Sequence, residues 1–329
     1  MTTPKTWLEA LTLSKLHRLA SSIGSPCSGT KPIRVQGIRE AISSAKKCKK
    51  DQLSLLSIDM GIRNLAFAHF TAKPASETSR LYDLPELQAW HRVAVSQAPR
   101  ELKASLGVDI VGDPTSELRT AKDLLDNDKK ESFEPIDYAG HAYHLVNHLL
   151  QTYNPNYVLI ERQRFRSGGR AAVPEWTIRV GVFEGMLHAV LRTLVESRRI
   201  KLVVEPMQPT QVNRYWFDDP DRAKPAGEKL TGRDGKRAKI DLVGNILEGQ
   251  SSTARVVIAE GLQPLAQQFV SVWKKEVRTK KGESKGISKL DDLADSFLQG
   301  LAWINWQNNR QRLDALGAEA VMLDLGLLR

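Results

Sequence analysis

Residues 53–70 decide the fold, and they read LSLLSIDMGIRNLAFAHF. Residues 53–58 are an apolar run of strand length, bounded by charges. Residues 59–61 supply a turn, and residues 64–70 read as the next strand. The stretch therefore predicts a β-hairpin with an aspartate, Asp59, at the end of its first strand.

The rest of the main domain, residues 51–329, alternates strands with helices. Apolar runs predict further strands at 88–95, 157–160 and 201–204, and helical spacing predicts helices at 138–153, 175–198 and 290–306. Polar or charged composition predicts loops at 97–132, 218–238 and 271–289. This order predicts an α/β fold with a mixed sheet flanked by helices.

Residues 1–45 read as a separate small helical unit. Apolar residues at helical spacing predict a first helix that Gly24 ends, and a turn at 25–32 leads to a second amphipathic helix. Helix, glycine, short turn and helix resembles the SAP family of small DNA-binding hairpins, which implies that Lys31 contacts DNA. The alternative is a bundle that only packs on the main domain.

Composition narrows the class of protein. The 329 residues carry 48 Lys and Arg against 38 Asp and Glu, a net charge of +10, which favours a polyanionic partner such as nucleic acid. Cys27 and Cys48 fit neither a metal site nor a disulfide framework, so a reducing compartment is expected. No apolar run approaches the ~20 residues of a membrane span, and the first twenty residues make a poor transit peptide.

Acidic residues sit where chemistry would need them. Asp59 and Glu161 each end an apolar strand, where side chains point out of the sheet edge. Asp291, Asp292 and Asp295 lie in the first turns of the last helix. Each acid alone also fits a structural role, as a turn cap, an ion-pair partner or a helix-dipole partner. Together they predict a carboxylate cluster for Mg²⁺ or Mn²⁺, the ions suited to hydrolysing a phosphodiester.

Three stretches carry a resemblance to a known family. Residues 57–66 look like the first strand and turn of the ribonuclease H-like superfamily. Residues 160–169, read with residues 289–296, resemble the fungal mitochondrial Holliday-junction resolvases, relatives of the bacterial RuvC resolvase, along essentially the whole chain. The resemblance implies a homodimer that nicks two opposing strands of a four-way DNA junction symmetrically with a divalent metal. It also implies a mitochondrial location and a short sequence preference at the cut.

The choice among the three helix acids stays open. On a helical wheel Asp291 and Asp295 lie together on one flank of the buried stripe, and Asp292 lies nearly opposite that stripe. The bacterial spacing, two aspartates three residues apart, selects Asp292 and Asp295 instead. Asp295 belongs to both sets.

Basic residues gather near the second strand acid and near the last helix. Arg162, Arg164, Arg166 and Arg170 surround Phe165, which we interpret as phosphate contacts around an apolar wedge for an opened junction centre. Lys274, Lys275, Lys280 and Lys281 belong to a basic loop expected to follow phosphates. The alternatives are a phenylalanine packed back onto its own domain and a merely solvated charge run.

Three other functions compete with a junction resolvase. The first is a nuclease of the same fold that acts on RNA–DNA hybrids, and the second is a junction-binding protein without catalysis. The intact acids argue against the second. An actin-like ATPase also opens with Asp-x-Gly after a strand, but it needs glycine-rich phosphate loops that this sequence lacks.

Overall fold

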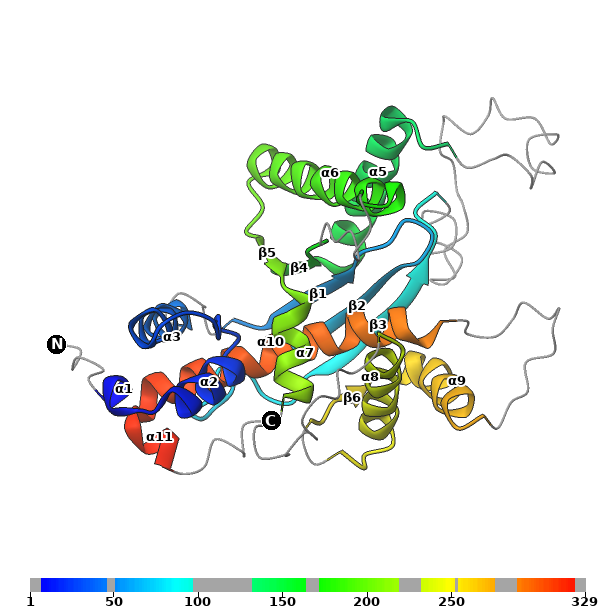
Figure 1. Ribbon diagram of the computed structural model, residues 1–329. Coiled ribbons are helices and arrows are strands. Elements are labelled where there is room, and N and C mark those ends of the chain that lie inside the picture. Colours follow the sequence, from blue (N-terminus) through cyan, green and yellow to red (C-terminus); the bar gives the residue numbers. More distant parts are fainter. Residues whose placement is uncertain are drawn as a thin grey trace, which may run out of the picture.

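The computed structural model describes residues 7–45, 51–96, 132–163, 172–218, 232–251, 254–275 and 289–322. At its centre lies one mixed sheet of six strands in the order β5-β4-β1-β2-β3-β6 (Figure 1). The strands are β1 (Leu53–Asp59), β2 (Leu65–Ala72), β3 (Glu86–Val93), β4 (Tyr157–Glu161), β5 (Val203–Met207) and β6 (Val257–Ile258).

The predicted hairpin and the mixed sheet are confirmed. β1 and β2 pair antiparallel, with Asp59 opposite Ala66, and β3 pairs antiparallel with β2. β4 pairs parallel with β1, and β5 pairs parallel with β4. The parallel strands end at one edge of the sheet, so they bring residues that follow β1 and β4 to the same rim.

Helices cover both faces of the sheet (Figure 1). On one face, α5 (Pro135–Tyr153) and α6 (Glu175–Arg198) bury apolar side chains against residues such as Ile58, Phe67 and Ile160. On the other face lie α7 (Pro209–Phe217), α8 (Gly232–Leu247), the 3-10 turn η3 (Glu260–Leu262), α9 (Gln263–Trp273) and α10 (Leu290–Leu316). None of the helices in the described part of the chain is long and apolar enough to cross a membrane.

Helix α10 packs unusually close to the strand that carries Asp59. A Cβ on Gly300 would lie 2.5 Å from the Phe70 ring and 3.0 Å from the Ser57 Cβ, so only glycine permits this approach. The buried Gln299 amide donates to Ser57 Oγ and to the Ile58 carbonyl, both at 3.1 Å. The position of α10 relative to the end of β1 is therefore fixed by packing and by hydrogen bonds.

The N-terminal residues fold as helices α1 (Trp7–Ala10), α2 (Leu13–Ser22) and α3 (Lys31–Ala45). They pack as one core with the end of α10 and with α11 (Ala318–Met322), through Leu313 and Ala320. The predicted first helix is in fact two, α1 and α2. This N-terminal unit therefore shares a core with the main domain, and its SAP-like role and contact with DNA stay a prediction.

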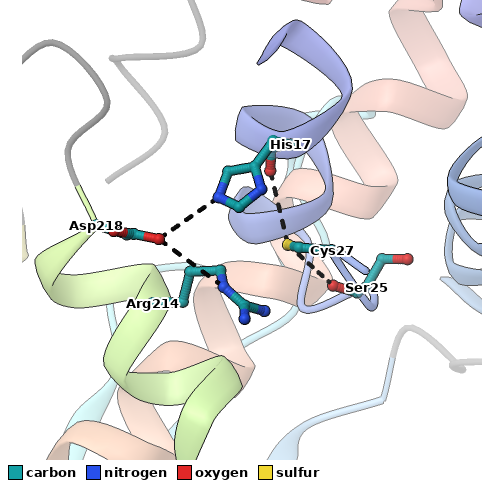
Figure 2. A network of polar contacts seen from close by, with 5 residues as sticks. All are labelled: His17, Ser25, Cys27, Arg214 and Asp218. Carbon is teal, nitrogen blue, oxygen red and sulfur yellow. Dashed lines mark hydrogen bonds and ion pairs between the residues drawn. The ribbon is translucent and has the colours of Figure 1, made fainter. Parts of the chain in front are cut away.

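Polar contacts also hold the N-terminal unit in place (Figure 2). The Asp218 carboxylate lies 3.4 Å from His17 Nε2 of α2 and 3.9 Å from Arg214 Nε of α7. The Cys27 thiol, buried beside them, donates to the backbone carbonyl oxygens of His17 and Ser25. Asp218 is the C-cap residue of α7. Its contact with His17 therefore joins α2 of the N-terminal unit to α7.

Two loop predictions are partly wrong. α8 begins at Gly232, inside the stretch 218–238, and α9 extends to Trp273, inside the stretch 271–289. α8 forms despite its glycines and charges because one of its faces packs into the core through Val243 and Ile246. The strand predicted at 201–204 runs instead from Val203 to Met207. The loop predicted at 97–132 lies outside the described residues except for Ser132.

Candidate active site

The two strand acids meet at the sheet edge, as their positions predicted. Asp59 ends β1 and Glu161 ends the neighbouring parallel strand β4, where Ile58 pairs with Ile160. Neighbouring strands lie only about 4.8 Å apart, and the two carboxyl groups share a hydrogen bond. The negative charge of Glu161 therefore opposes ionisation of Asp59.

The first turns of α10 bring further acids to the same place. Asp295 and Asp292 are the helix carboxylates that act most strongly on Asp59. Asp291 instead accepts a hydrogen bond of 2.5 Å from Lys236 on α8. Asp292 and Asp295 thus lie within electrostatic reach of Asp59, while Asp291 pairs with Lys236. The choice between Asp291 and Asp292 as the partner of Asp295 stays a prediction.

The acid cluster is defined as Asp59, Glu161, Asp292 and Asp295. Its three aspartates have raised pKa values. Burial, followed by the charge and hydrogen bond of Glu161, holds the pKa of Asp59 well above its ordinary value. Burial raises the pKa of Asp295 to about 6, although Lys239 opposes the shift. Burial and the charge of Asp291 also raise the pKa of Asp292. A bound divalent cation would favour the ionised form of these carboxyl groups.

Two lysines of α8 belong to the site, and the sequence interpretation missed them. Lys239 Nζ lies 2.6 Å from Asp295 Oδ1, with both side chains largely buried. Lys236 pairs with Asp291; burial alone would raise the pKa of Asp291, but the Lys236 ammonium lowers it overall. Lys236 and Lys239 are three residues apart, a spacing that places both on one face of a helix. This spacing was missed because residues 218–238 were interpreted as a loop.

The acid cluster suits a hard divalent cation by its chemistry. Its donors are carboxylate oxygens, the ligands preferred by Mg²⁺ and Mn²⁺. Asp292 Oδ2 is buried and makes no hydrogen bond, so one oxygen is left without a partner. Within the described ranges, no three His, Cys, Asp or Glu side chains already converge closely enough to hold an ion.

Four of the ten predicted DNA contacts lie in the described residues. Lys31 and Arg162 are exposed, and Lys274 and Lys275 follow the end of α9, where Lys274 pairs with Glu248. The remaining predicted contacts fall outside the described residues: Arg164, Phe165, Arg166, Arg170, Lys280 and Lys281.

Sheet order and acid positions together define a class of protein. Three antiparallel strands followed by two parallel ones, with acids at the ends of β1 and β4 and at the start of the last long helix, are the arrangement of a ribonuclease H-like core. A family model described as "Mitochondrial resolvase Ydc2 / RNA splicing MRS1" matches residues 55–313. The chain belongs to this family.

Two curated relatives agree with this assignment. "Cruciform cutting endonuclease 1, mitochondrial" of Schizosaccharomyces pombe is 30% identical over 192 residues, which cover 57% of this chain and 65% of that protein. The protein of the same name from Saccharomyces cerevisiae is 22% identical over an alignment of 336 residues, covering 92% of this chain and 84% of that protein. The chain thus spans just under two thirds of the first relative and most of the second.

A solved structure confirms the fold. The yeast mitochondrial Holliday junction resolvase Ydc2 superposes with a TM-score of 0.56 at 21% identity, over 95% of this chain and 99% of that chain. The likeness covers the sheet and its flanking helices, so the predicted ribonuclease H-like architecture is confirmed.

Proposed function

We propose that the chain is a metal-dependent endonuclease that resolves four-way DNA junctions by paired, symmetric nicks. The observation that supports this proposal is that Asp59, Glu161, Asp292 and Asp295 lie within electrostatic reach of one another at one edge of a resolvase-family sheet. Side chains that serve only the fold gain nothing from such mutual repulsion, and groups with strongly shifted pKa values cluster at functional sites.

The acid cluster would hold Mg²⁺ or Mn²⁺ between β1, β4 and α10. The bound ion would supply activation of the attacking water and stabilisation of the leaving oxygen. Asp59 and Glu161 sit on a buried strand edge and keep their positions, while Asp292 and Asp295 approach from a helix that Gln299 ties to β1. Lys239 of α8 neutralises part of the charge of Asp295, which lowers the repulsion that an approaching phosphate meets.

The substrate is proposed from the relatives and from charge. Both curated relatives are named as cruciform cutting endonucleases, and the net charge of +10 suits DNA. The family description also names RNA splicing, so a protein that binds nucleic acid without cutting it is the competing function. The complete acid cluster favours cleavage.

DNA contact is assigned to the basic groups around the site. Arg162, Arg164, Arg166 and Arg170 would hold phosphates near Glu161, with Phe165 as an apolar wedge. Lys274, Lys275, Lys280 and Lys281 would follow a DNA arm, and Lys31 would contact DNA from the N-terminal unit.

A homodimer is part of the proposal, since paired nicks require two sites. The outer face of α6 carries Ile178 and Val182, which are 45% and 49% exposed. With about 100° per residue, these two positions point directly away from the buried stripe of α6. An exposed apolar stripe on a long, regular helix suits packing against its own copy across a two-fold axis. The site of action is the mitochondrion, as named for both relatives and in the family description.

One experiment separates the candidate functions. The purified chain is incubated with a labelled four-way junction, a matched duplex and an RNA–DNA hybrid, with Mg²⁺ or with EDTA. Symmetric nicking of the junction alone, only with Mg²⁺, is expected. Preferential cutting of the hybrid would replace the substrate, and tight junction binding with no cutting would replace catalysis by binding.

A further inference from the structure

Four side chains from separate parts of the chain form an aromatic–arginine cluster beside the β1–β2 turn. The guanidinium carbon of Arg63 lies 5.3 Å from the centre of the Trp176 ring and 6.0 Å from that of Phe133. The Arg179 guanidinium lies 4.0 Å from the Phe133 ring centre. The two rings meet edge to face, with their centroids 5.9 Å apart. Each ring is thus held by a cation and by the other ring.

This cluster lies at the same rim as the acid cluster. Arg63 follows Asp59 by four residues, so their Cα atoms are at most about 14 Å apart. On the other side, the backbone N–H of Gln163, two residues after Glu161, donates to a Glu184 carboxylate oxygen at 2.8 Å. That bond fixes α6, and with it Trp176, to the end of β4.

Trp176 is not simply a core residue. Together with Val180 and Phe183 it continues the buried stripe of α6, but 41% of it stays exposed. All seven tryptophans of the chain fall in described residues, and each of the other six is buried or half-buried. An indole that is positioned by Arg63 and Phe133 yet faces solvent presents a rigid aromatic surface.

The chemistry of this surface fits a nucleobase. Aromatic side chains stack on unpaired bases, with arginine adding cation–π contact. Arg63 also adds positive charge near the acids, whereas Arg179 is ion-paired with Glu175 of the same helix. Bases inside a duplex are already stacked, so the platform would gain contact only where a base is unpaired.

We propose that Trp176 and Phe133, held by Arg63 and Arg179, form a platform that stacks one unpaired base at the junction centre. This inference rests on the proposed function and gives it a specific source of structure selectivity. The competing explanation is that the cluster only fastens the β1–β2 turn to α6.

The test uses the full chain carrying Asp59→Asn, so that DNA stays uncut during titration. Tryptophan emission is measured with junction and with duplex, and the signal of Trp176 is isolated by subtracting the same titration of a variant that also carries Trp176→Phe. Junction is expected to quench Trp176 and duplex to leave it unchanged. A 2-aminopurine placed at the junction centre should be quenched in parallel, since it would be the stacking partner.

Binding titrations at fixed salt provide the second measurement. Trp176→Ala should weaken junction binding about tenfold, the size of one base–aromatic stacking contact, without weakening duplex binding. Trp176→Phe should retain most of the affinity. The matched control is Ile136→Ala, an exposed apolar residue close to Phe133 in sequence, which should change neither affinity.

Two outcomes would overturn the inference. Trp176 emission that stays unchanged on saturation with junction would make the cluster a structural fastening. Equal losses of affinity for junction and duplex, with an unchanged melting temperature, would make it a DNA contact that does not select an unpaired base. If Trp176→Ala lowers the melting temperature, the emission of the parent chain decides, because that measurement needs no destabilising variant. Failure of the unmodified chain to cut a junction would remove the proposed function, whereas stacking is still judged by Trp176 emission on a single-stranded oligonucleotide.

Discussion

The Lys239 ammonium lies 2.6 Å from Asp295 Oδ1 of the acid cluster. Lys239 reaches this position from α8, a helix that the sequence pattern did not predict, and its side chain is 17% exposed. The protein therefore supplies one cation of its own to a cluster that repels itself, and this counter-charge has measurable consequences.

Replacement of this counter-charge should destabilise the metal-free protein. With Lys239→Met, Asp295 stays buried without its ion-pair partner, and we expect unfolding at pH 8 to become easier by about 1–3 kcal/mol. Mg²⁺ should restore more stability in this variant than in the parent. Lys236→Met is the matched control; its side chain is 63% exposed, so the loss should stay below about 1 kcal/mol. Equal losses in urea titrations would show that burial of the pair is irrelevant.

Neutralising the acids should separate stability from activity. Asp59→Asn is expected to abolish cleavage and to raise the stability of the metal-free protein at pH 8. The sign follows from the raised pKa of Asp59. A carboxyl whose folded pKa lies above its unfolded value favours folding at low pH and loses that contribution as the pH rises through the folded pKa.

The same argument gives Asp295 a pH window. Its pKa of about 6, against 3.8 in the unfolded chain, predicts that Asp295→Asn stabilises the metal-free protein above pH 6, by up to about 3 kcal/mol. No gain is expected below about pH 4. Thermal melts at pH 4, 6 and 8 in EDTA measure this difference, and a gain independent of pH would contradict the assigned cause.

Acidic pH should destabilise the folded protein through His69 of β2, whose ring packs against Tyr153 of α5. This histidine is 5% exposed, and burial lowers its pKa from 6.5 to about 4. Since the unfolded chain binds the proton more readily, stability is lost as the pH falls from about 6.5 towards 4, by about 3 kcal/mol in total. His69→Gln should flatten this part of the stability curve. Parallel curves for the two proteins would assign the acid sensitivity to other groups.

The contact between the N-terminal unit and α10 leaves no room at Gly24. A Cβ there would lie 2.3 Å from Trp306 Cε3, and the backbone has φ of +65°. We expect Gly24→Ala to destabilise the fold by about 2–4 kcal/mol, from overpacking and backbone strain together. Gly249→Ala is a close control, because φ is +70° there but nothing lies within 4 Å; its cost should be about 1 kcal/mol. Equal costs would mean that Trp306 moves aside freely.

The proposed dimer predicts a change of mass. Val182→Glu places a charge on the outer stripe of α6, and we expect the protein to sediment as a monomer while keeping its helical circular dichroism. Ile136→Glu, at an exposed position of α5 away from that stripe, should leave the dimer intact. A monomeric parent protein, or a Val182→Glu variant that still dimerises, would exclude this face.

The sequence predicted the parts of the molecule whose signal is local. The hairpin at Asp59, the strand that ends at Glu161 and the full extent of α6 follow from runs and periods within a few residues. The contact between Lys236 and Asp291 does not follow from such a local signal, because it depends on where α8 packs. α8 in turn forms through its packing against α10, a contact between segments far apart in sequence, which glycine and charge content concealed.

The aromatic–arginine cluster shows the same limit. Arg63, Phe133 and Trp176 are separated by long stretches of chain, and none has a local pattern that marks it. Only the sheet, by placing the β1–β2 turn against the start of α6, brings them together.

Helix α10 connects the two ends of the molecule. Near its start it presents Asp295, and fifteen residues later Arg310 donates to the Ile23 carbonyl of the N-terminal unit. At 1.5 Å per residue the two points are about 22 Å apart along one rigid helix, which equals the rise of six or seven base pairs at 3.4 Å each. If the N-terminal unit binds a DNA arm, the rigid helix fixes the distance between that contact and the acid cluster. The distance from the bound segment to the cut would then be set by the protein and would not vary with the flexibility of a linker.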